Sequence, residues 1–96
     1  MEIIWSPEAQ NDYWNNIQYL LEEFSVEVAQ DFIEKVDQYI NTISNNPKAF
    51  QTVNYKNIRF VPVVPKISLY YRVAKNQIEI LRFFNNLQDP KQKNLK

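Results

Sequence analysis

The chain of 96 residues contains no cysteine, no histidine and no glycine. Without cysteine there is no disulfide framework and no thiol nucleophile. Without histidine the protein lacks the usual general base near neutral pH and the most common metal ligand. Without glycine it has no Gly-rich phosphate-binding loop. These absences narrow the chemistry open to the chain, and we expect it to use neither a metal nor a cofactor.

Long hydrophobic runs are absent as well. No stretch approaches the roughly 20 apolar residues of a membrane-spanning helix. The N-terminus lacks the basic and apolar regions of a secretory signal peptide. Apolar residues make up 45% of the chain and aromatic residues 15%, which is enough for one hydrophobic core. We therefore expect residues 1–96 to form a single domain that is cytoplasmic and does not contact a membrane.

Charges of both signs are equally frequent but unevenly distributed. Residues 1–46 contain nine acidic residues and one basic residue, a net charge of −8. Residues 47–96 contain ten basic and two acidic residues, a net charge of +8. This asymmetry indicates either a charged partner for one half or neutralisation of one half by the other within the domain.

The first half has the periodicity of two helices after a short strand at residues 2–5. Residues 6–8 (Ser-Pro-Glu) are a strong helix start, because serine caps free amides, proline suits the first turn and glutamate meets the positive end of the dipole. Apolar residues recur at helical spacing to Phe24 and again after a second cap at Ser25. Residues 45–47 (Asn-Asn-Pro) end the second helix. The short connection predicts an antiparallel hairpin.

The second half changes to the alternating pattern of β-strands. We expect strands at residues 55–63, 67–74 and 77–84, a two-residue turn at residues 75–76, and a polar tail from residue 85 with one helical turn after residues 89–90. Helices followed by strands predict an α+β fold. In this fold the N-terminal strand joins an antiparallel sheet of about four strands, and the helical hairpin packs on one face of it.

Basic and aromatic side chains on the expected strands are the candidate partner-binding residues: Lys56, Arg59, Tyr70, Arg72 and Arg82. Arginine presents a fork of donors that matches phosphate or carboxylate, and a tyrosine beside it can stack on a base. Each arginine could equally be a solvated residue or part of a surface ion pair. Arg82 is ambiguous, because strict alternation puts it in register with core positions and it could instead pair with an acid on a helix. The other helical acids are expected on solvated faces, and they do not suggest a metal site.

Several local motifs occur in an order that is typical of one family. They are Trp5-Ser6-Pro7-Glu8-Ala9, Ala29-Gln30-Asp31-Phe32-Ile33, Asn57-Ile58-Arg59, Leu69-Tyr70-Tyr71-Arg72-Val73 and Ile78-Glu79-Ile80-Leu81-Arg82, followed by Gln88-Asp89-Pro90. Over nearly its whole length the chain resembles the RelE/ParE-family toxins of bacterial type II toxin–antitoxin systems, also called the plasmid stabilisation family. The resemblance implies a growth-inhibiting toxin that a cognate antitoxin neutralises in a hetero-oligomer.

The family includes two mechanisms. RelE-like toxins cleave mRNA on the ribosome, with arginines and lysines that hold phosphates and a tyrosine or histidine that assists proton transfer. ParE-like toxins lack this set and inhibit DNA gyrase. Many relatives have a histidine shortly after the last strand and an arginine two residues later, where this chain has Asn85 and Leu87. Asparagine is neither an acid nor a base at neutral pH, so the resemblance favours a ParE-like, non-enzymatic toxin.

Two alternatives stay open at this point. In a RelE-like, ribosome-dependent mRNA endonuclease the catalytic residues would be Arg59, Tyr70, Arg72 and Arg82. A degenerate toxin would act only as a partner-binding module. In each case, the antitoxin segment is expected to be acidic or amphipathic, and to dock by strand addition or as a helix in a groove.

Overall fold

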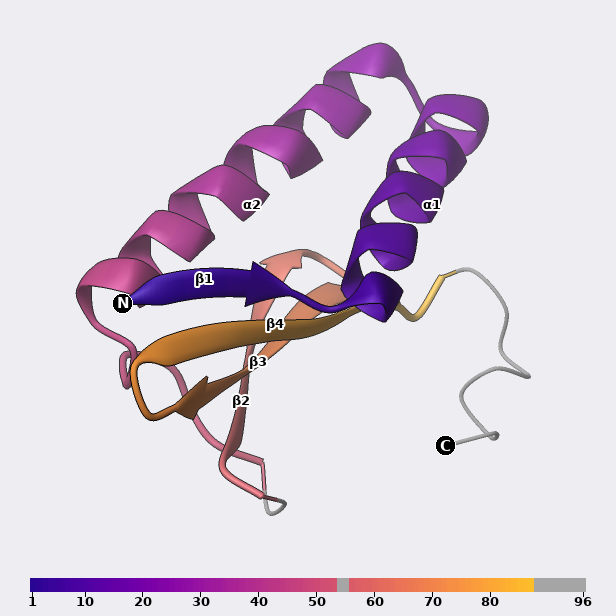
Figure 1. The fold of residues 1–96 in the computed structure, drawn as a ribbon. Coiled ribbons are helices and arrows are strands. Elements are labelled where there is room, and N and C mark those ends of the chain that lie inside the picture. Colours follow the sequence, from indigo (N-terminus) through magenta and orange to yellow (C-terminus); the bar gives the residue numbers. More distant parts are fainter. Residues whose placement is uncertain (54–55, 88–96) are drawn as a thin grey trace.

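Two helices cover one face of a four-stranded sheet in the computed structural model of the chain, which describes residues 1–53 and 56–87 (Figure 1). β1 (Glu2–Trp5) leads into α1 (Pro7–Glu23) and α2 (Val26–Asn45), which form the predicted antiparallel hairpin. The chain then forms β2 (Ile58–Val64), β3 (Ile67–Ala74) and β4 (Gln77–Asn85). The α+β fold is confirmed. The helical turn expected after residues 89–90 lies outside the described residues.

The sheet is mixed, whereas we expected a wholly antiparallel one. Its strand order is β1-β4-β3-β2, with antiparallel pairing between β2, β3 and β4. β1 pairs with β4 in parallel, from Glu2 beside Gln77 to Trp5 beside Ile80. Parallel pairing of two strands requires a long crossover connection between them. The helical hairpin supplies this crossover, because it carries the chain back over the sheet after β1 and before β2 begins.

Both helices begin at the serines that the sequence indicates. The Ser6 hydroxyl accepts a hydrogen bond from the Ala9 amide at 2.9 Å, and the Ser25 hydroxyl accepts one from the Val28 amide at 3.1 Å. These bonds satisfy amides that have no partner inside the helix. Within the described residues, no helix is both long and apolar enough to cross a membrane.

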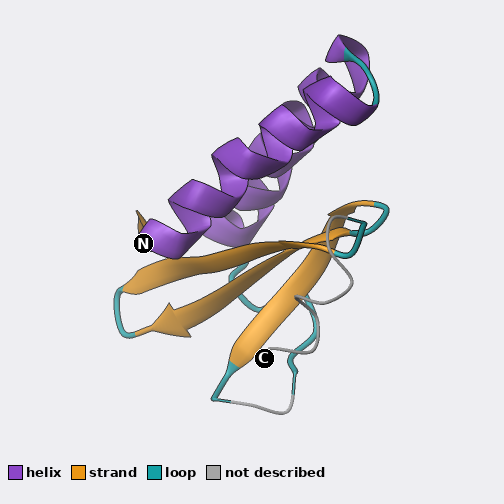
Figure 2. Cartoon of the chain, turned by 90° about the vertical axis from the view of Figure 1, so that its right-hand side faces the viewer, coloured by secondary structure: helices purple, strands orange, loops and turns teal. Residues whose placement is uncertain are grey.

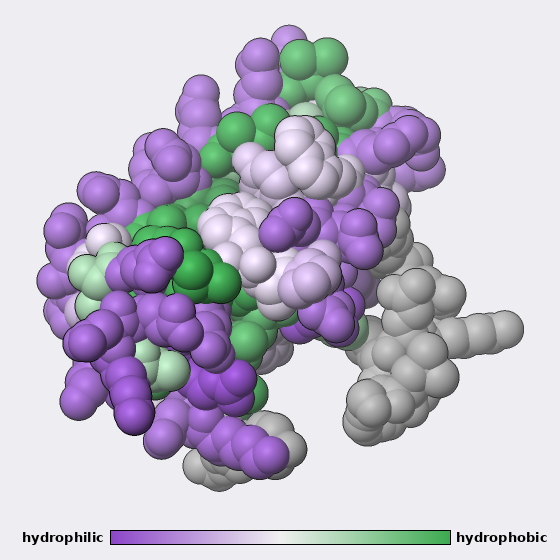
Figure 3. Space-filling model, in the orientation of Figure 1, coloured by the Kyte–Doolittle hydropathy of each residue, from purple (hydrophilic) through white to green (hydrophobic). Residues whose placement is uncertain are grey.

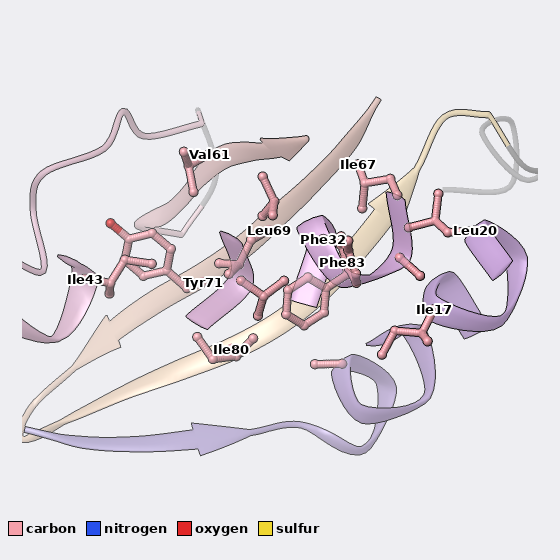
Figure 4. Packing of buried hydrophobic residues seen from close by; sticks show 14 of the residues in the cluster. Ile17, Leu20, Phe32, Ile43, Val61, Ile67, Leu69, Tyr71, Ile80 and Phe83 are labelled. Atoms are coloured by element: carbon pink, nitrogen blue, oxygen red, sulfur yellow. The ribbon is translucent and has the colours of Figure 1, made fainter. Parts of the chain in front are cut away.

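The core lies between the helical layer and the sheet (Figure 4). Tyr71, Phe32 and Phe83 are its largest fully buried or nearly fully buried side chains. The Phe83 ring lies 5.3 Å from the ring of Trp5 and 6.2 Å from that of Phe32, measured between centroids. Burying one such side chain stabilises a fold by about 1.5–3 kcal/mol. This aromatic cluster therefore fixes how α1 and α2 sit on β4.

A β-bulge in β4 changes which side chains face the core. Tyr70 pairs with Arg82 and Tyr71 pairs with Ile80, so Leu81 has no partner on β3. Ile80 is buried on one side of the bulge and Phe83 on the other. The extra residue shifts the alternation by one position. Arg82 therefore lies on the face opposite the core, which removes the ambiguity that strict alternation left.

Several turn residues of this glycine-free chain adopt a disfavoured backbone conformation. Lys56, Asn57, Lys66 and Lys75 have φ angles of 49°, 61°, 78° and 36°. A residue with a Cβ atom is disfavoured in this left-handed region, whereas glycine is not. Lys66 forms the β2–β3 turn, and Lys75 lies in the predicted turn at residues 75–76.

We expect Lys66→Gly to raise the free energy of unfolding by about 0.5–1 kcal/mol, because relief of the backbone penalty exceeds the added entropy of the unfolded chain. Urea denaturation measures the change. Lys35→Gly in α2 is the control, and it should cost about 1 kcal/mol because glycine weakens a helix interior. A loss of stability in both variants would contradict the strain at Lys66.

Candidate functional site

Both helices lie on one face of the sheet, and the opposite face is the candidate site (Figure 2). Side chains of directly paired residues share a face. One row across this face contains Ile58, Arg72 and Glu79, and the next contains Phe60, Tyr70 and Arg82. We call this surface the open face.

Arg59, one of the candidate partner-binding residues, lies on the other side of the sheet and does not join Arg72 and Arg82 on the open face. It pairs with Tyr71, whose side chain is fully buried in the core. The Arg59 guanidinium donates to the Phe50 carbonyl at 2.6 Å. The Tyr71 hydroxyl donates to the Pro47 carbonyl at 2.8 Å. These two side chains anchor the segment that follows α2.

Tyr71 is unsuited to proton transfer. Burial raises the pKa of its hydroxyl, although the nearby charge of Arg59 lowers it. The hydroxyl stays protonated near neutral pH and is already engaged with a backbone carbonyl.

Arg72 lies on the open face, and an acid of the neighbouring strand holds it. Its Nη2 atom is 3.0 Å from Oε1 of Glu79, and its Nε atom also donates to that oxygen at 3.0 Å. The two residues are direct cross-strand partners. An anion that approaches Arg72 must therefore compete with Glu79.

Arg82 forms a bidentate pair with Asp12 of α1. Its Nε atom lies 2.6 Å from Oδ2 and its Nη2 atom 3.1 Å from Oδ1. Hydrogen bonding to Asp12 is the main cause that raises the pKa of Arg82. Asp12 also accepts the Phe83 amide at 2.9 Å, and the Ser6 hydroxyl donates to the Leu81 carbonyl at 2.9 Å. The start of α1 thus binds the polar groups of the bulge.

Aromatic rings occupy the middle of the open face. Phe60 and Tyr70 stack with centroids 5.6 Å apart and planes inclined by 21°. Tyr70, Arg82 and Phe84 line a shallow hollow of about 280 Å³. The sequence alone did not identify Phe60 or Phe84 as candidate site residues. For Phe84 the reason is the bulge, since strict alternation along the strand would put its side chain in the core. Lys56 is exposed in the turn before β2.

Asn85 is buried in a polar network under α1. Its side chain is 7% exposed, and its Nδ2 atom donates to Oδ1 of Asn16 at 2.8 Å. The Asn16 amide donates to the Phe83 carbonyl at 3.2 Å, and the Leu87 amide donates to Oδ1 of Asn85 at 2.7 Å. Asn85 therefore faces the helical layer. Among the described residues, no group of three or more acidic side chains could hold a metal ion.

The family model described as "ParE toxin of type II toxin-antitoxin system, parDE" matches residues 3–90. The chain belongs to this ParE toxin family. No curated protein matches the ParE-family chain in sequence.

Solved structures of toxins share the fold of this ParE-family chain. One, from the chromosomal ParDE toxin–antitoxin system of P. aeruginosa, is 18% identical, with a TM-score of 0.74 over 88% of this chain and 95% of that one. The YoeB dimer from Staphylococcus aureus is 19% identical, with a TM-score of 0.63 over 88% and 94%. The E. coli DinJ-YafQ toxin–antitoxin complex contains a chain that is 14% identical, with a TM-score of 0.63 over 92% and 97%.

Proposed function

We propose that this ParE-family toxin inhibits growth by binding a protein target, DNA gyrase, and does not cleave RNA. The observation that carries the proposal is the engagement of all three candidate arginines by groups of the same chain. Arg59 donates to a backbone carbonyl, Arg72 pairs with Glu79, and Arg82 pairs with Asp12. A phosphate-binding site needs such groups to be available to the ligand.

The chemistry of RNA cleavage also lacks candidates for its proton transfers. Attack by the 2′-hydroxyl needs a base, and the leaving oxygen needs an acid. The chain has no histidine, and Asn85, at the position where many relatives have one, is buried under α1. The stacked rings and paired charges of the open face resemble a protein interface, in which aromatic residues and arginine are enriched.

We further propose a cognate antitoxin as the partner that neutralises the toxin in a hetero-oligomer, in the cytoplasm. Supporting this, several similar structures are described as toxin–antitoxin complexes, among them DinJ-YafQ from E. coli and YoeB-YefM from Staphylococcus aureus. Lys56, Tyr70, Arg72 and Arg82 are the candidate contacts. Arg59 is not among them, because it lies on the helical side of the sheet and donates to the Phe50 carbonyl.

Purified chain is expected to inhibit DNA supercoiling by gyrase and to leave ribosome-bound mRNA intact. Tyr70→Ala should weaken the inhibition about tenfold or more, because central aromatic residues dominate protein interfaces. Lys35→Ala on α2 is the matched control, and it should have no effect. Gyrase activity and mRNA integrity are assayed on the same preparations.

Two outcomes would count against this proposal. Ribosome-dependent mRNA cuts that disappear in Tyr70→Phe would indicate a RelE-like endonuclease. Antitoxin binding without growth arrest or gyrase inhibition would indicate a degenerate toxin.

A further inference from the structure

A small pocket lies between the two helices, where they approach β1. α1 and α2 diverge from the tip of the hairpin toward this strand (Figure 1). The pocket has a volume of about 290 Å³. Trp5 of β1 and Tyr13 of α1 line it, and Ile33, Val36 and Ile40 of α2 complete its apolar lining. Three elements therefore form this pocket, and it lies on the opposite side of the sheet from the open face.

Two half-buried aromatic rings give this pocket an affinity for cations. The centroids of the Trp5 and Tyr13 rings lie 5.2 Å apart, with their planes inclined by 84°. The face of an aromatic ring is electrostatically negative and attracts ammonium groups. Hydrophobic side chains and side chains of intermediate hydropathy gather between the helices, and hydrophilic ones border them (Figure 3).

Two carboxylates at the pocket have no counter-charge. Glu34 and Asp37 are exposed lining residues from α2. They are three positions apart on one helix, so their Cβ atoms lie about 5–6 Å from each other. The ion pairs within residues 1–53 and 56–87 use other acids, and no basic residue of this part of the chain lines the pocket. Burial raises the pKa of the Tyr13 hydroxyl, and the charge of Asp37 raises it further.

We infer that this pocket binds a linear diammonium cation of the alkyl diamine or polyamine class. The methylene chain of such a cation would pack on Ile33 and Ile40. Its two ammonium groups would meet Glu34 and Asp37, and the group at Asp37 would also face the Tyr13 ring. A small-molecule site usually combines an apolar lining with a few polar groups that fix the orientation of the ligand. The inference is independent of the gyrase target.

The pocket disfavours other ions. A divalent metal ion needs several oxygen ligands, and in the described part of the chain no group of three or more acidic side chains could hold one. The hairpin, residues 7–45, contains eight acidic residues and one basic residue, a net charge of −7. A potential of this sign attracts cations and repels anions. An organic cation satisfies both the apolar lining and the two carboxylates.

The test follows the fluorescence of Trp5 in the full chain with Trp14→Phe, which removes the only other tryptophan. Trp14 is 65% exposed and does not line the pocket. Titration with 1,4-diaminobutane at constant ionic strength should change the emission of Trp5 saturably. 1-Aminobutane has one ammonium group fewer, and it should bind about tenfold more weakly.

A matched pair of double variants locates the binding. Glu34→Gln combined with Asp37→Asn should weaken diamine binding about tenfold. Glu23→Gln combined with Glu27→Gln is the control, because it removes the same charge from exposed positions of the same hairpin outside the pocket. The control should bind the diamine as the parent does. Circular dichroism checks that each variant folds.

Four results would overturn the inference. An equal loss in the control variant, or an equal response to magnesium chloride, would reduce the binding to general attraction of charge. Tighter binding of a lysine tripeptide than of the diamine would identify basic side chains of a protein as the ligand. The absence of saturable binding in both fluorescence and isothermal titration calorimetry would show that the pocket takes no diamine. Gyrase inhibition is measured separately, so none of these results bears on the proposed target.

Discussion

Asp12→Ala is expected to lower the free energy of unfolding by about 2–4 kcal/mol. The Asp12 carboxylate accepts the Phe83 amide at 2.9 Å and holds Arg82 through two hydrogen bonds. Its side chain is only 14% exposed. Alanine leaves the amide at the bulge without its acceptor, and it releases the guanidinium on the open face. Urea denaturation of both proteins measures the loss.

Asp31→Ala separates this role from that of an ordinary ion pair. Asp31 also pairs with a base, Lys35 at 3.3 Å, but both side chains are well exposed and lie one helical turn apart. Its removal should cost less than about 0.5 kcal/mol. Asp12→Asn keeps an acceptor for the Phe83 amide and should recover part of the loss. Similar losses for Asp12→Ala and Asp31→Ala would show that Asp12 does not hold the bulge.

Asn85→Ala should be equally costly, at about 2–4 kcal/mol. It removes the hydrogen bonds to Asn16 and to the Leu87 amide, leaves both groups buried or half-buried without these partners, and opens a small cavity. Thermal denaturation followed by circular dichroism measures the effect. The open face is unchanged, so the folded fraction should still inhibit gyrase.

Two variants define what Asn85 does. Asn86→Ala changes the exposed neighbour and should stay within about 0.5 kcal/mol of the parent protein. Asn85→His introduces the residue that many relatives have, but at a position that faces α1. It should not produce ribosome-dependent mRNA cleavage, and cleavage by this variant would refute our assignment of a structural role.

The helices could be predicted closely because their signals are local. Ser6 and Ser25 cap the helices within a few residues, and the apolar spacing continues without interruption to the last turn of each. The strands were placed well for the same reason. The parallel pairing of β1 depends on where the hairpin returns the chain, and no local pattern in residues 2–5 encodes it.

The candidate site was harder to predict because the local sequence does not determine on which face of the sheet a side chain lies. Arg59 and Arg72 both lie on strands in which apolar and polar residues alternate. Only the register of β2 with β3, which pairs Arg59 with Tyr71, shows that Arg59 lies on the helical side of the sheet. At Leu81 the alternation shifts, and the polar groups that hold the bulge come from Ser6 and Asp12, about 70 residues earlier in the chain. Pairing across such a distance cannot be deduced from spacing within one strand.

The neighbouring positions of β1 and β4 have a consequence for synthesis on the ribosome. The hairpin emerges long before the strands whose apolar side it covers, and β1 has no partner until β4 has been made. The hollow formed by Tyr70, Arg82 and Phe84 also needs β4. A nascent chain therefore lacks this hollow until β4 has been made, because Arg82 and Phe84 both come from that strand.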